Sequence, residues 1–497
     1  MRAPAAGPFA TRALSLAFLL AAAPAAHALD DPLQEIGVTP YCWRRHGTTF
    51  EGDTGASVVI GVVWTGFDLY HPDLMAADGR TRVLAVWDQS VTTGGTASFG
   101  YGTEWSAAEI DNRRADIRTD DKGTALAVLA AGSGRASPRL TGIAPEAKLV
   151  LVRSTLDPWD IVDAVDYIFR VAAAARCPAV VDLSLNTHLS SHDGTDSLDV
   201  RLDRLTGPGR ILVAAAGNEG GLGIHAAASL GESRVESLRF EVSDSGPLVP
   251  DLNNVCVFAA YPESADVTLR VRDSMGVQLL EAAKGATAWR ADSVAQLKLC
   301  NGLGCEDCAD FPGKTIAALQ MFGAGDRWRA PGVWTLELEP RHASSGDRLD
   351  AWIQLPMGGP AARFEAPEDA KLVGWPACAD SVISVGAYEP APTFGDGREA
   401  LWPQSSPGPL RDGREAVDLV APGCRVRVPA GRDSTAQWSG TSFAAAYATG
   451  AVALLLGAHP NASPAQIRAE LRRRAKPVAA SADRWGHGKL WMGAPVE

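Results

Sequence analysis

The sequence predicts an α/β protein with a doubly wound parallel sheet, into which an antiparallel β-sandwich is inserted. Two observations predict the parallel sheet: apolar strands alternate with helical segments, and polar motifs follow directly after several of these strands. A third observation predicts the sandwich. Between residues 228 and 365, apolar and polar residues alternate, which is typical of antiparallel strands with one solvated face.

The first strand of the parallel sheet is expected at 58–63, a continuous apolar run typical of a strand that is covered on both faces. Further strands of this α/β pattern are expected at 149–152, 179–185, 211–216, 382–386 and 417–423. Helical spacing is found at 125–131, 160–175 and 464–474, and a small-residue helix begins at Ser442. This order of strands and helices implies right-handed βαβ units.

The insert is predicted from two clear alternations, one around residues 267–272 and one around residues 334–339. In the first, Val267 and Leu269 flank a threonine; in the second, Trp334 and Leu336 do the same. The predicted organisation is an export signal at 1–28, an α/β domain at 29–227 and 366–497, and a β-sandwich at 228–365.

The export signal is predicted from two arginines, Arg2 and Arg12, the apolar stretch 13–26, and the small-x-small site Ala26-His27-Ala28. Cleavage would change the formal net charge from −12 to −14, because it removes both arginines and no acidic residue. The mature protein is expected in the periplasm or outside the cell, and its acidic charge argues against nucleic acid as a partner. No later apolar run is expected to span a membrane.

Eight cysteines in an exported chain allow disulfides. Cys300, Cys305 and Cys308 have a C-x4-C-x2-C spacing, but the export signal and the lack of a nearby fourth ligand argue against a metal or iron–sulfur site. A local disulfide, with Cys256 as a candidate member, is preferred. No metal or other cofactor is expected.

The strongest candidate for chemistry is Ser442, in Gly440-Thr441-Ser442-Phe443-Ala444. A serine that opens a helix lies at the positive end of the helix dipole, beside backbone N–H groups without an intrahelical partner. An oxyanion formed there would be stabilised, so the position suits the nucleophile of acyl transfer. An ordinary helix-capping serine is the alternative.

Several of these segments resemble those of the subtilisin-like serine peptidases, the subtilase family. Residues 440–444 resemble the family's nucleophile motif, and residues 215–219 resemble its oxyanion segment, with Asn218 as the side-chain donor. Further matching segments are 141–145, 375–377 and 417–423. The insert, through residues 332–353, resembles that of the clostridial germination (Csp) subtilases.

The departures from the family pattern fall on the catalytic base. The family's aspartate position is occupied by Trp64, and its histidine position by Lys122. His46 precedes the first core strand and is expected to lie on the surface, while His71 is expected to be structural. Asp68 matches a position where the family often has a non-catalytic acidic residue.

A serine without a base is a weak nucleophile, so the sequence predicts a catalytically impaired pseudoprotease. One alternative is an active peptidase in which a desolvated Lys122 serves Ser442 as base; another is that Lys122 points to solvent. An unrecognised base and a purely structural exported domain also remain open.

The resemblance implies an extended-peptide groove that needs no triad for binding, since strand addition uses backbone hydrogen bonds. The expected ligand is a peptide or a protein, and a cognate active peptidase is a candidate partner. The groove is expected to be formed by Ser184, Leu185, Asn186, Ala215, Ala216 and Gly217.

Overall fold

The structure, a computed structural model, describes residues 31–494 except 48, 92–98, 232–233, 244–253, 292–294, 303–310, 324–330, 356–360 and 391–399. The predicted export signal lies outside the described residues. The chain divides into two compact units, and each is considered by itself. The α/β unit comprises the described residues up to Asn186, Leu198–Asn218 and those from Pro376 onward. The sandwich unit comprises Thr187–Ser197 and Glu219–Trp375.

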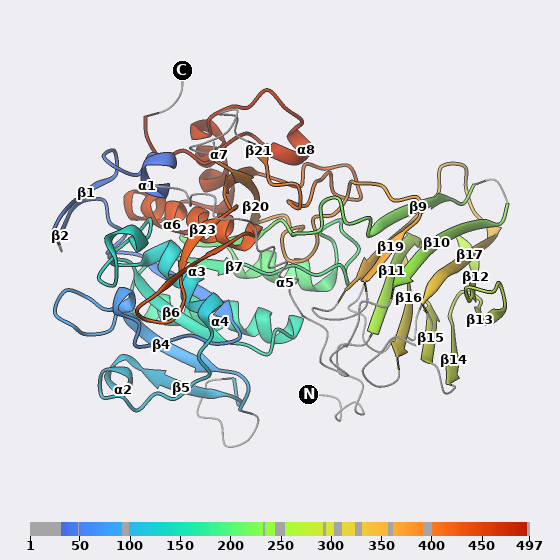
Figure 1. The fold of residues 1–497 in the computed structure, drawn as a ribbon, viewed down its shortest axis with the longest axis horizontal. Helices are drawn as coiled ribbons and strands as arrows, with labels where there is room; N and C mark the ends of the chain where they lie inside the picture. The colour runs from blue at the N-terminus through green and yellow to red at the C-terminus, as the bar shows by residue number, and fades with distance from the viewer. Residues whose placement is uncertain are drawn as a thin grey trace. The chain divides into compact units, whose positions relative to one another are not determined.

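The α/β unit is built on a mixed sheet with the strand order β21-β20-β8-β7-β3-β6-β4-β5, with β22 beside β20 (Figure 1). Only β5 and β21 pair antiparallel; the other neighbours run parallel, which confirms the predicted fold class. The strands are β3 (Val59–Trp64), β4 (Val83–Asp88), β5 (Thr103–Ser106), β6 (Lys148–Arg153), β7 (Ala179–Leu183), β8 (Arg210–Ala215), β20 (Val382–Glu389), β21 (Ala400–Leu401) and β22 (Leu419–Pro422).

Helices pack against this sheet, and two of them carry the candidate site. The helix α3 packs against both β3 and α6, and α6 in turn packs against β7, β8, β20 and β22. The longer helices are α3 (Asp121–Ala131), α4 (Pro158–Ala174), α5 (Ser197–Leu205), α6 (Thr441–Ala458) and α7 (Pro464–Arg474). Shorter elements are α1 (Pro32–Glu35), α2 (Ala107–Asp111), α8 (Ala482–Trp485), η1 (Pro72–Leu74), η2 (Pro138–Leu140), and the hairpins β1 (Trp43–His46)–β2 (Thr49–Gly52) and β23 (Val426–Pro429)–β24 (Thr435–Trp438).

The helix α6 corrects the expectation that no later apolar run is long enough to cross a membrane. By length and composition alone, its 18 residues pass that test. All residues from Thr441 to Leu456 are buried inside the protein, and many are alanine or glycine. Small side chains allow close packing against the sheet, so α6 is a core helix of the α/β unit.

The strand β3 is buried along its whole length, and its glycine shows how closely the helix α4 approaches it. A Cβ atom added to Gly61 would lie 2.5 Å from Ile168 Cγ2 of α4. At the carboxyl ends of the parallel strands, β3 ends in Trp64, and the chain continues from β7 into Ser184 and from β8 toward Asn218. Functional groups collect at this edge of parallel sheets.

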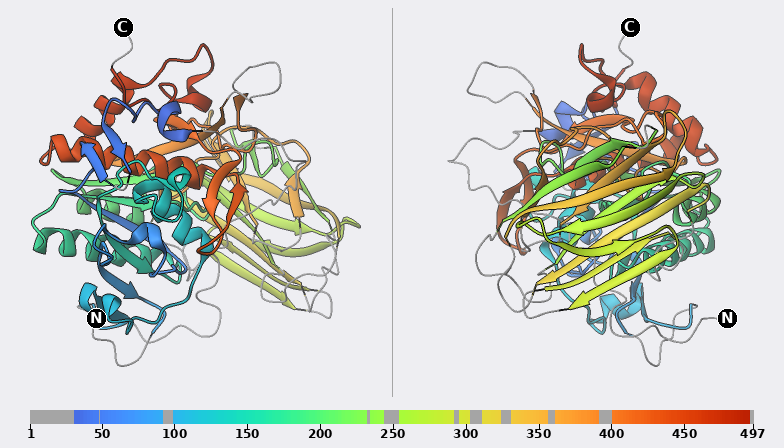
Figure 2. Two further views of the ribbon diagram at one scale, coloured as in Figure 1. Left: turned by 60° about the vertical axis from the view of Figure 1, so that its left-hand side comes forward. Right: turned by 90° about the vertical axis from the view of Figure 1, so that its right-hand side faces the viewer.

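The sandwich unit contains two antiparallel sheets, with the strand orders β13-β12-β17-β10-β19 and β14-β15-β16-β11-β18-β9 (Figure 2). This confirms the predicted antiparallel insert. The strands are β9 (His225–Ser229), β10 (Glu236–Ser243), β11 (Asn254–Pro262), β12 (Asp266–Arg272), β13 (Gln278–Ala282), β14 (Ala286–Ala291), β15 (Ala295–Asn301), β16 (Lys314–Gly323), β17 (Gly332–His342), β18 (Arg348–Gln354) and β19 (Ala361–Phe364).

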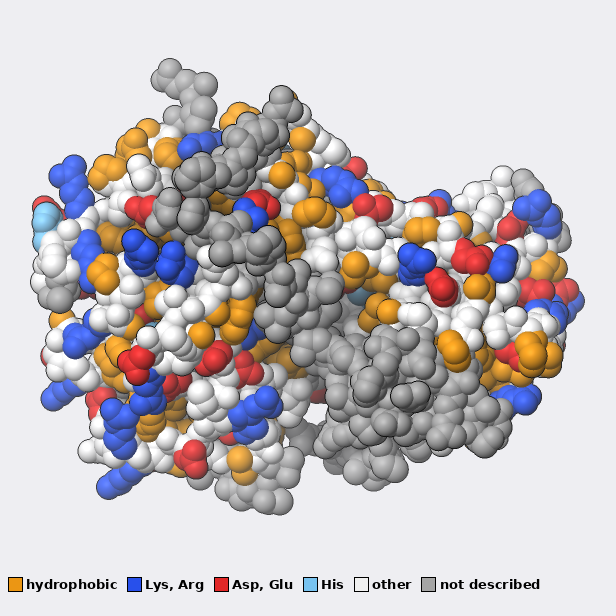
Figure 3. All heavy atoms as spheres, viewed as in Figure 1, with side chains coloured by type: hydrophobic (Ala, Val, Ile, Leu, Met, Phe, Trp, Pro, Cys, Tyr) orange, Lys and Arg blue, Asp and Glu red, His pale blue; other side chains and the backbone are white. Residues whose placement is uncertain are grey.

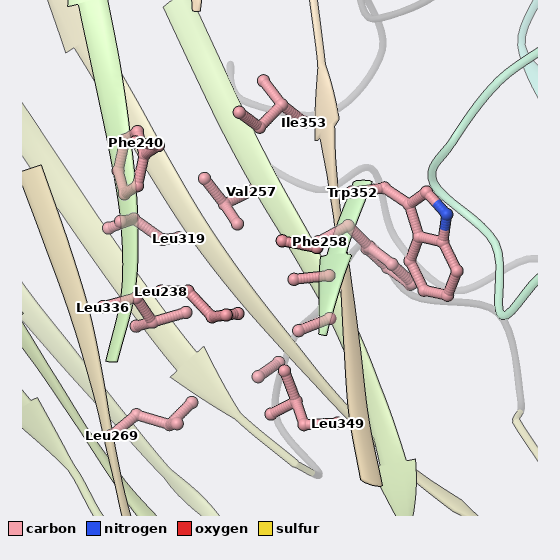
Figure 4. Packing of buried hydrophobic residues seen from close by; sticks show 14 of the residues in the cluster. Leu238, Phe240, Val257, Phe258, Leu269, Leu319, Leu336, Leu349, Trp352 and Ile353 are labelled. Carbon is pink, nitrogen blue, oxygen red and sulfur yellow. The ribbon is translucent and has the colours of Figure 1, made fainter. Parts of the chain in front are cut away.

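The core of the sandwich unit is formed by the apolar residues that alternate along its strands. Val267, Leu269, Trp334 and Leu336 are all buried in one cluster, as the alternation predicts. Figure 4 shows side chains from both sheets in this cluster, among them Phe240, Val257, Leu269, Leu319, Leu336 and Leu349.

A ladder of parallel rings, His188, His192, Trp352 and His225, anchors the segment Thr187–Ser197 within the sandwich unit. The centroids of neighbouring rings lie 5.1, 4.0 and 5.1 Å apart. The three histidines are buried, and His188 Nδ1 and His192 Nε2 lie 3.4 Å apart. This segment follows directly after Asn186, one of the predicted groove residues.

Candidate functional site

Ser442 is the second residue of α6 and is only 1% exposed. Gly440 precedes the helix and has no side chain that could accept a hydrogen bond from the first N–H groups of α6. The Ser442 hydroxyl donates a hydrogen bond to the backbone carbonyl of Ser184, at 3.0 Å. Because a hydroxyl has a single proton, this arrangement commits the Ser442 proton to a peptide oxygen, which is not a catalytic base.

Asn218 is oriented as an oxyanion donor would be. It follows β8, and its Oδ1 accepts hydrogen bonds from the Thr441 N–H and the Thr441 hydroxyl, both at 2.9 Å. A backbone N–H can only donate, so these contacts fix which end of the amide faces Thr441. The Asn218 NH₂ group therefore points to the other side, as required for stabilising a developing negative charge.

Trp64 and Lys122 lie together, as the resemblance implies for the positions that they occupy. The Lys122 Nζ atom lies 4.2 Å from the centroid of the Trp64 ring, and the residues are 5% and 4% exposed. The alternative in which Lys122 points to solvent is therefore wrong. Asp120 caps α3, and its carboxylate accepts a hydrogen bond from the Lys122 N–H at 2.9 Å. This bond fixes the start of the helix that carries the lysine.

Burial is the main influence on the protonation of Lys122. It lowers the pKa of Lys122 to about 7, and the negative charges of Asp120 and Asp182 oppose this shift. A lysine with this pKa is a mixture of amine and ammonium near neutral pH. The site can thus supply a neutral amine, which an ordinary surface lysine cannot.

Asp182 is the member of the site that the sequence did not predict. It lies in β7, is fully buried, and its Oδ1 accepts a hydrogen bond from the Ser184 hydroxyl at 2.6 Å. The same hydroxyl lies 2.8 Å from the Ser442 carbonyl oxygen. Burial raises the pKa of Asp182 to about 7, against the Ser184 hydrogen bond and the charge of Lys122. The sequence does contain a signal for this role, since Asp182 lies inside a predicted buried strand at 179–185. A carboxylate is rarely buried unless it has a partner.

The other residues considered as bases or acids are held by contacts of their own in the α/β unit. His46 is exposed in β1 and lies 3.3 Å from Glu51. His71 is buried, and its Nδ1 accepts from the Asp73 N–H at 3.2 Å as part of the η1 turn. Asp68 forms an ion pair with Arg432. These positions agree with the surface, structural and non-catalytic roles that the sequence suggested.

The predicted groove residues are mostly buried, and part of their backbone is already bonded. Of the six residues, only Asn186 is partly exposed. The Ala216 N–H donates to Val385 at 3.0 Å, and the Gly217 N–H donates to the Thr441 hydroxyl at 3.2 Å. Strand addition cannot use these two N–H groups unless their present bonds break.

The hairpin β23–β24, which leads into the nucleophile motif, is fastened to the segments beside Trp64 and Lys122. At its tip, Arg432 donates to both carboxylate oxygens of Asp68, at 2.5 and 2.6 Å. The neighbouring Gly431 N–H donates to Asp121 Oδ1 at 3.2 Å. These contacts hold the hairpin against the two motifs that have lost the family's aspartate and histidine.

The predicted disulfide is not found among the cysteines that the structure describes. None of these six, Cys42, Cys177, Cys256, Cys300, Cys378 and Cys424, is bonded to another. Cys305 and Cys308 lie outside the described residues. Within the described part of the chain, no group of three or more His, Cys, Asp or Glu side chains could hold a metal ion.

Acidic and basic side chains are interspersed on the face in Figure 3.

Comparisons with known proteins agree with the fold described above. A family model described as the subtilase family matches residues 55–249 and 345–488. The fold is similar to that of the CspB protease of Clostridium perfringens, with 21% sequence identity and a TM-score of 0.72, over 88% of this chain and 92% of that chain. Weaker likenesses, over the same shares of each chain, are to a structure described as an S41 psychrophilic protease (18% identity, TM-score 0.47) and to sphericase (16%, 0.47). The predicted resemblance, including that of the insert, is confirmed.

Proposed function

Because the chain belongs to the subtilase family, we propose that it is an exported, catalytically impaired subtilase that binds a peptide or protein segment. One observation carries this proposal: Lys122, folded over Trp64, occupies the position of the base, while the Ser442 proton is donated to the Ser184 carbonyl. The nucleophile is present, but the group that should take its proton is replaced.

The kinetic consequence follows from what a base contributes. A positioned general base typically accelerates proton transfer by about 10²–10⁴-fold, and the carboxylate normally stabilises the cation that forms. The aspartate position holds Trp64, whose indole is not an acceptor. Hydrolysis would depend on the oxyanion groups alone, which supports a role in binding.

The groups that remain favour a ligand with a peptide carbonyl. The NH₂ group of the Asn218 amide is a donor of the kind that binds a carbonyl oxygen. The partly exposed Asn186 and the strand before it supply a further contact for an extended chain. A peptide segment of a cognate active peptidase would fit this description, and the predicted export signal supports an encounter outside the cytoplasm.

A second function is favoured by one specific observation, the burial of Lys122. Its pKa of about 7 allows a neutral amine to accept the Ser442 proton, as in a serine hydrolase with a lysine base. This activity requires the Ser442 hydroxyl to leave the Ser184 carbonyl and turn to Lys122.

The two functions are separated by labelling the purified protein with a fluorophosphonate probe between about pH 6 and about pH 10. The impaired subtilase should label no faster than the Ser442→Ala variant. Labelling that requires both Ser442 and Lys122, and that rises with pH, would instead establish the hydrolase. Circular dichroism of each variant confirms that it is folded.

Binding is tested separately, by fluorescence anisotropy with a fluorescein-labelled unfolded protein. The wild-type protein should bind it, and the Asn218→Ala variant should bind about tenfold more weakly, because one hydrogen-bond donor is lost. Equal binding by both proteins would show that the carbonyl-binding groups are not part of the binding site.

A further inference from the structure

Two buried polar atoms near Lys122 have no hydrogen-bond partner among the described residues. One is a donor, the Nε1–H of Trp64, and the other is an acceptor, Oδ2 of Asp182. Both residues are more than nine-tenths buried. Buried polar atoms in native proteins are nearly always satisfied, so an unmatched donor and an unmatched acceptor beside one lysine indicate that a small polar group belongs there.

The position of Lys122 in its helix favours an anion rather than a cation. Lys122 is the second residue of α3, an 11-residue helix, and so lies at the positive end of the helix dipole. Asp120 already caps this end, and its carboxylate accepts from the Lys122 and Gly123 N–H groups. A modification that changed the lysine from positive to negative would place its charge where the helix stabilises it.

We propose that Lys122 is a carbamylation site, whose amine binds one molecule of carbon dioxide covalently. The nitrogen lone pair forms a bond to the carbon of CO₂, and one C=O π bond breaks to leave its electron pair on oxygen. The nitrogen then loses one proton to the Asp182 carboxylate. An amine and a carboxylate become a carbamate and a carboxylic acid, so the net charge is unchanged and no group is oxidised or reduced.

The surroundings of Lys122 match each requirement of this step. Burial keeps a share of the lysine as the neutral amine near pH 7, because it lowers the pKa to about 7. Burial also raises the pKa of Asp182 to about 7, which makes it a suitable proton acceptor. The Trp64 N–H can donate to a carbamate oxygen, since the flexible lysine stem can bring its end from the ring face to the ring edge.

This inference goes beyond the proposed function, because the modification requires no reaction of Ser442. It also has a consequence for the site. A carbamate is a carboxylate-like base, and it would stand where the family's histidine stands. CO₂ would then control whether the Ser442 position has a base at all.

The chain offers a matched control in Lys314, which lies in the sandwich unit. Its side chain is also buried, but its Nζ lies 2.6 Å from Asp193 Oδ1 and 3.3 Å from Asp196 Oδ1. An ammonium group held by two carboxylates has no lone pair with which to attack CO₂. Lys314 should therefore stay unmodified although its side chain is buried.

The test is ¹³C NMR of the full-length protein in ¹³C-bicarbonate, followed by alkylation of any carbamate with triethyloxonium and peptide mapping. We expect one carbamate resonance, mapped to Lys122 and present also in Ser442→Ala. It should be absent from Lys122→Arg and from protein in CO₂-free buffer, and Lys314 should carry no adduct. Trp64→Phe, which keeps a ring but removes the N–H, should lower the occupancy about tenfold.

No carbamate resonance in the folded wild-type protein would overturn the proposal, and so would a resonance that survives Lys122→Arg. Unchanged occupancy in Trp64→Phe would overturn the role of the indole N–H. Because the carbamate is detected directly and in Ser442→Ala, its absence would leave the proposed binding function untouched.

Discussion

The Nζ atom of Lys122 lies 4.2 Å from the centroid of the Trp64 ring, so the two substituted triad positions are in direct contact. The indole covers the lysine and excludes water from it. A cation held over an indole in a desolvated site gains about 2 kcal/mol, which partly offsets the desolvation of the ammonium group. The two substitutions are therefore physically coupled, because the two side chains pack against each other in a buried site.

Replacing Lys122 by methionine should stabilise the protein by up to about 4 kcal/mol at about pH 6 in CO₂-free buffer, because it removes an ammonium group whose charged form is disfavoured by burial. The folded-state pKa of Lys122, about 7, lies below the unfolded value, so the unfolded chain binds more protons between the two. Wild-type stability therefore rises with pH above about 7, and the advantage of methionine should shrink toward about pH 10.

Denaturant unfolding at several pH values measures this difference. The control is Lys476→Met, which removes a less buried lysine that also lies over an indole, 3.5 Å from the centroid of Trp491. That variant should show no gain that depends on pH. A Lys122→Met variant less stable than the wild type at about pH 6 would contradict the burial of a costly charge.

Replacing Arg432 by alanine should release the tip of the β23–β24 hairpin, because both hydrogen bonds to Asp68 are lost. Amides at 430–434 should exchange hydrogen faster, while global stability should change by only about 1 kcal/mol, since the Arg432 side chain is 47% exposed. Arg170→Ala, which removes an exposed ion pair with Asp166, is the control.

The same contact predicts a pH effect. Burial raises the pKa of Asp68, but the hydrogen bonds from Arg432 and the Tyr70 N–H outweigh it, and the pKa is lowered overall. The carboxylate therefore contributes its full stabilisation above its unfolded pKa of about 3.9 and loses it as the pH falls further. Exchange at 430–434 that is unaffected by Arg432→Ala would contradict this account of the hairpin.

Much of the fold could be predicted because its signals are local. Continuous apolar runs predicted β3, β6, β8 and β20, and the predicted helix 464–474 matches α7 at both ends. The predicted end of β7 was less accurate, since the strand ends at Leu183 and the prediction extended it to Leu185. The Leu185 N–H bonds to the Leu183 carbonyl at 2.7 Å, a local bend with no strong sequence signal.

The site was predictable in its members but not in its electrostatics. The sequence motifs identified Ser442, Asn218, Trp64 and Lys122, and the structure brings each into the α/β unit at the edge where strands end. Whether Lys122 faces solvent depends on packing between α3 and β3, which no local pattern encodes. The role of Asp182 was missed for the same reason, because its neighbours come from other segments.

Replacing His192 by phenylalanine should remove part of the acid sensitivity of the sandwich unit while keeping a ring in the ladder. Burial, and then the charges of His188 and His225, hold the pKa of His192 well below 6.5. The unfolded chain thus takes up a proton that the folded chain does not as the pH falls below about 6.5, which lowers stability by about 1.4 kcal/mol per pH unit.

Unfolding followed by tryptophan fluorescence between about pH 7 and about pH 5 measures the slope. His46→Phe, at an exposed position in β1, should leave it unchanged. The groups that face the ladder remain in both variants: Asp350 lies 3.1 Å from His225 Nε2, and Glu219 lies 3.5 Å from His188 Nε2. Identical slopes for His192→Phe and the wild type would contradict the assignment.

Replacing Lys314 by methionine should destabilise the sandwich unit by roughly 3–5 kcal/mol, because two buried carboxylates would lose their shared cation. Adding Asp193→Asn and Asp196→Asn to this variant should recover much of the loss, since no uncompensated charge then remains. Chemical denaturation at neutral pH measures both. A loss below about 1 kcal/mol in Lys314→Met would show that the ion pairs are not buried as described.

The central claim is that the nucleophile and the Asn218 donor are intact, and that the base and the aspartate that supports it are missing. Restoring the base with Trp64→Asp and Lys122→His tests it most directly, by fluorophosphonate labelling and peptide hydrolysis at neutral pH. The doubly substituted protein should label Ser442 at least about 100-fold faster than the wild type. If the folded variant gains nothing, or if the wild-type protein already labels through Ser442 at a comparable rate, the claim is contradicted.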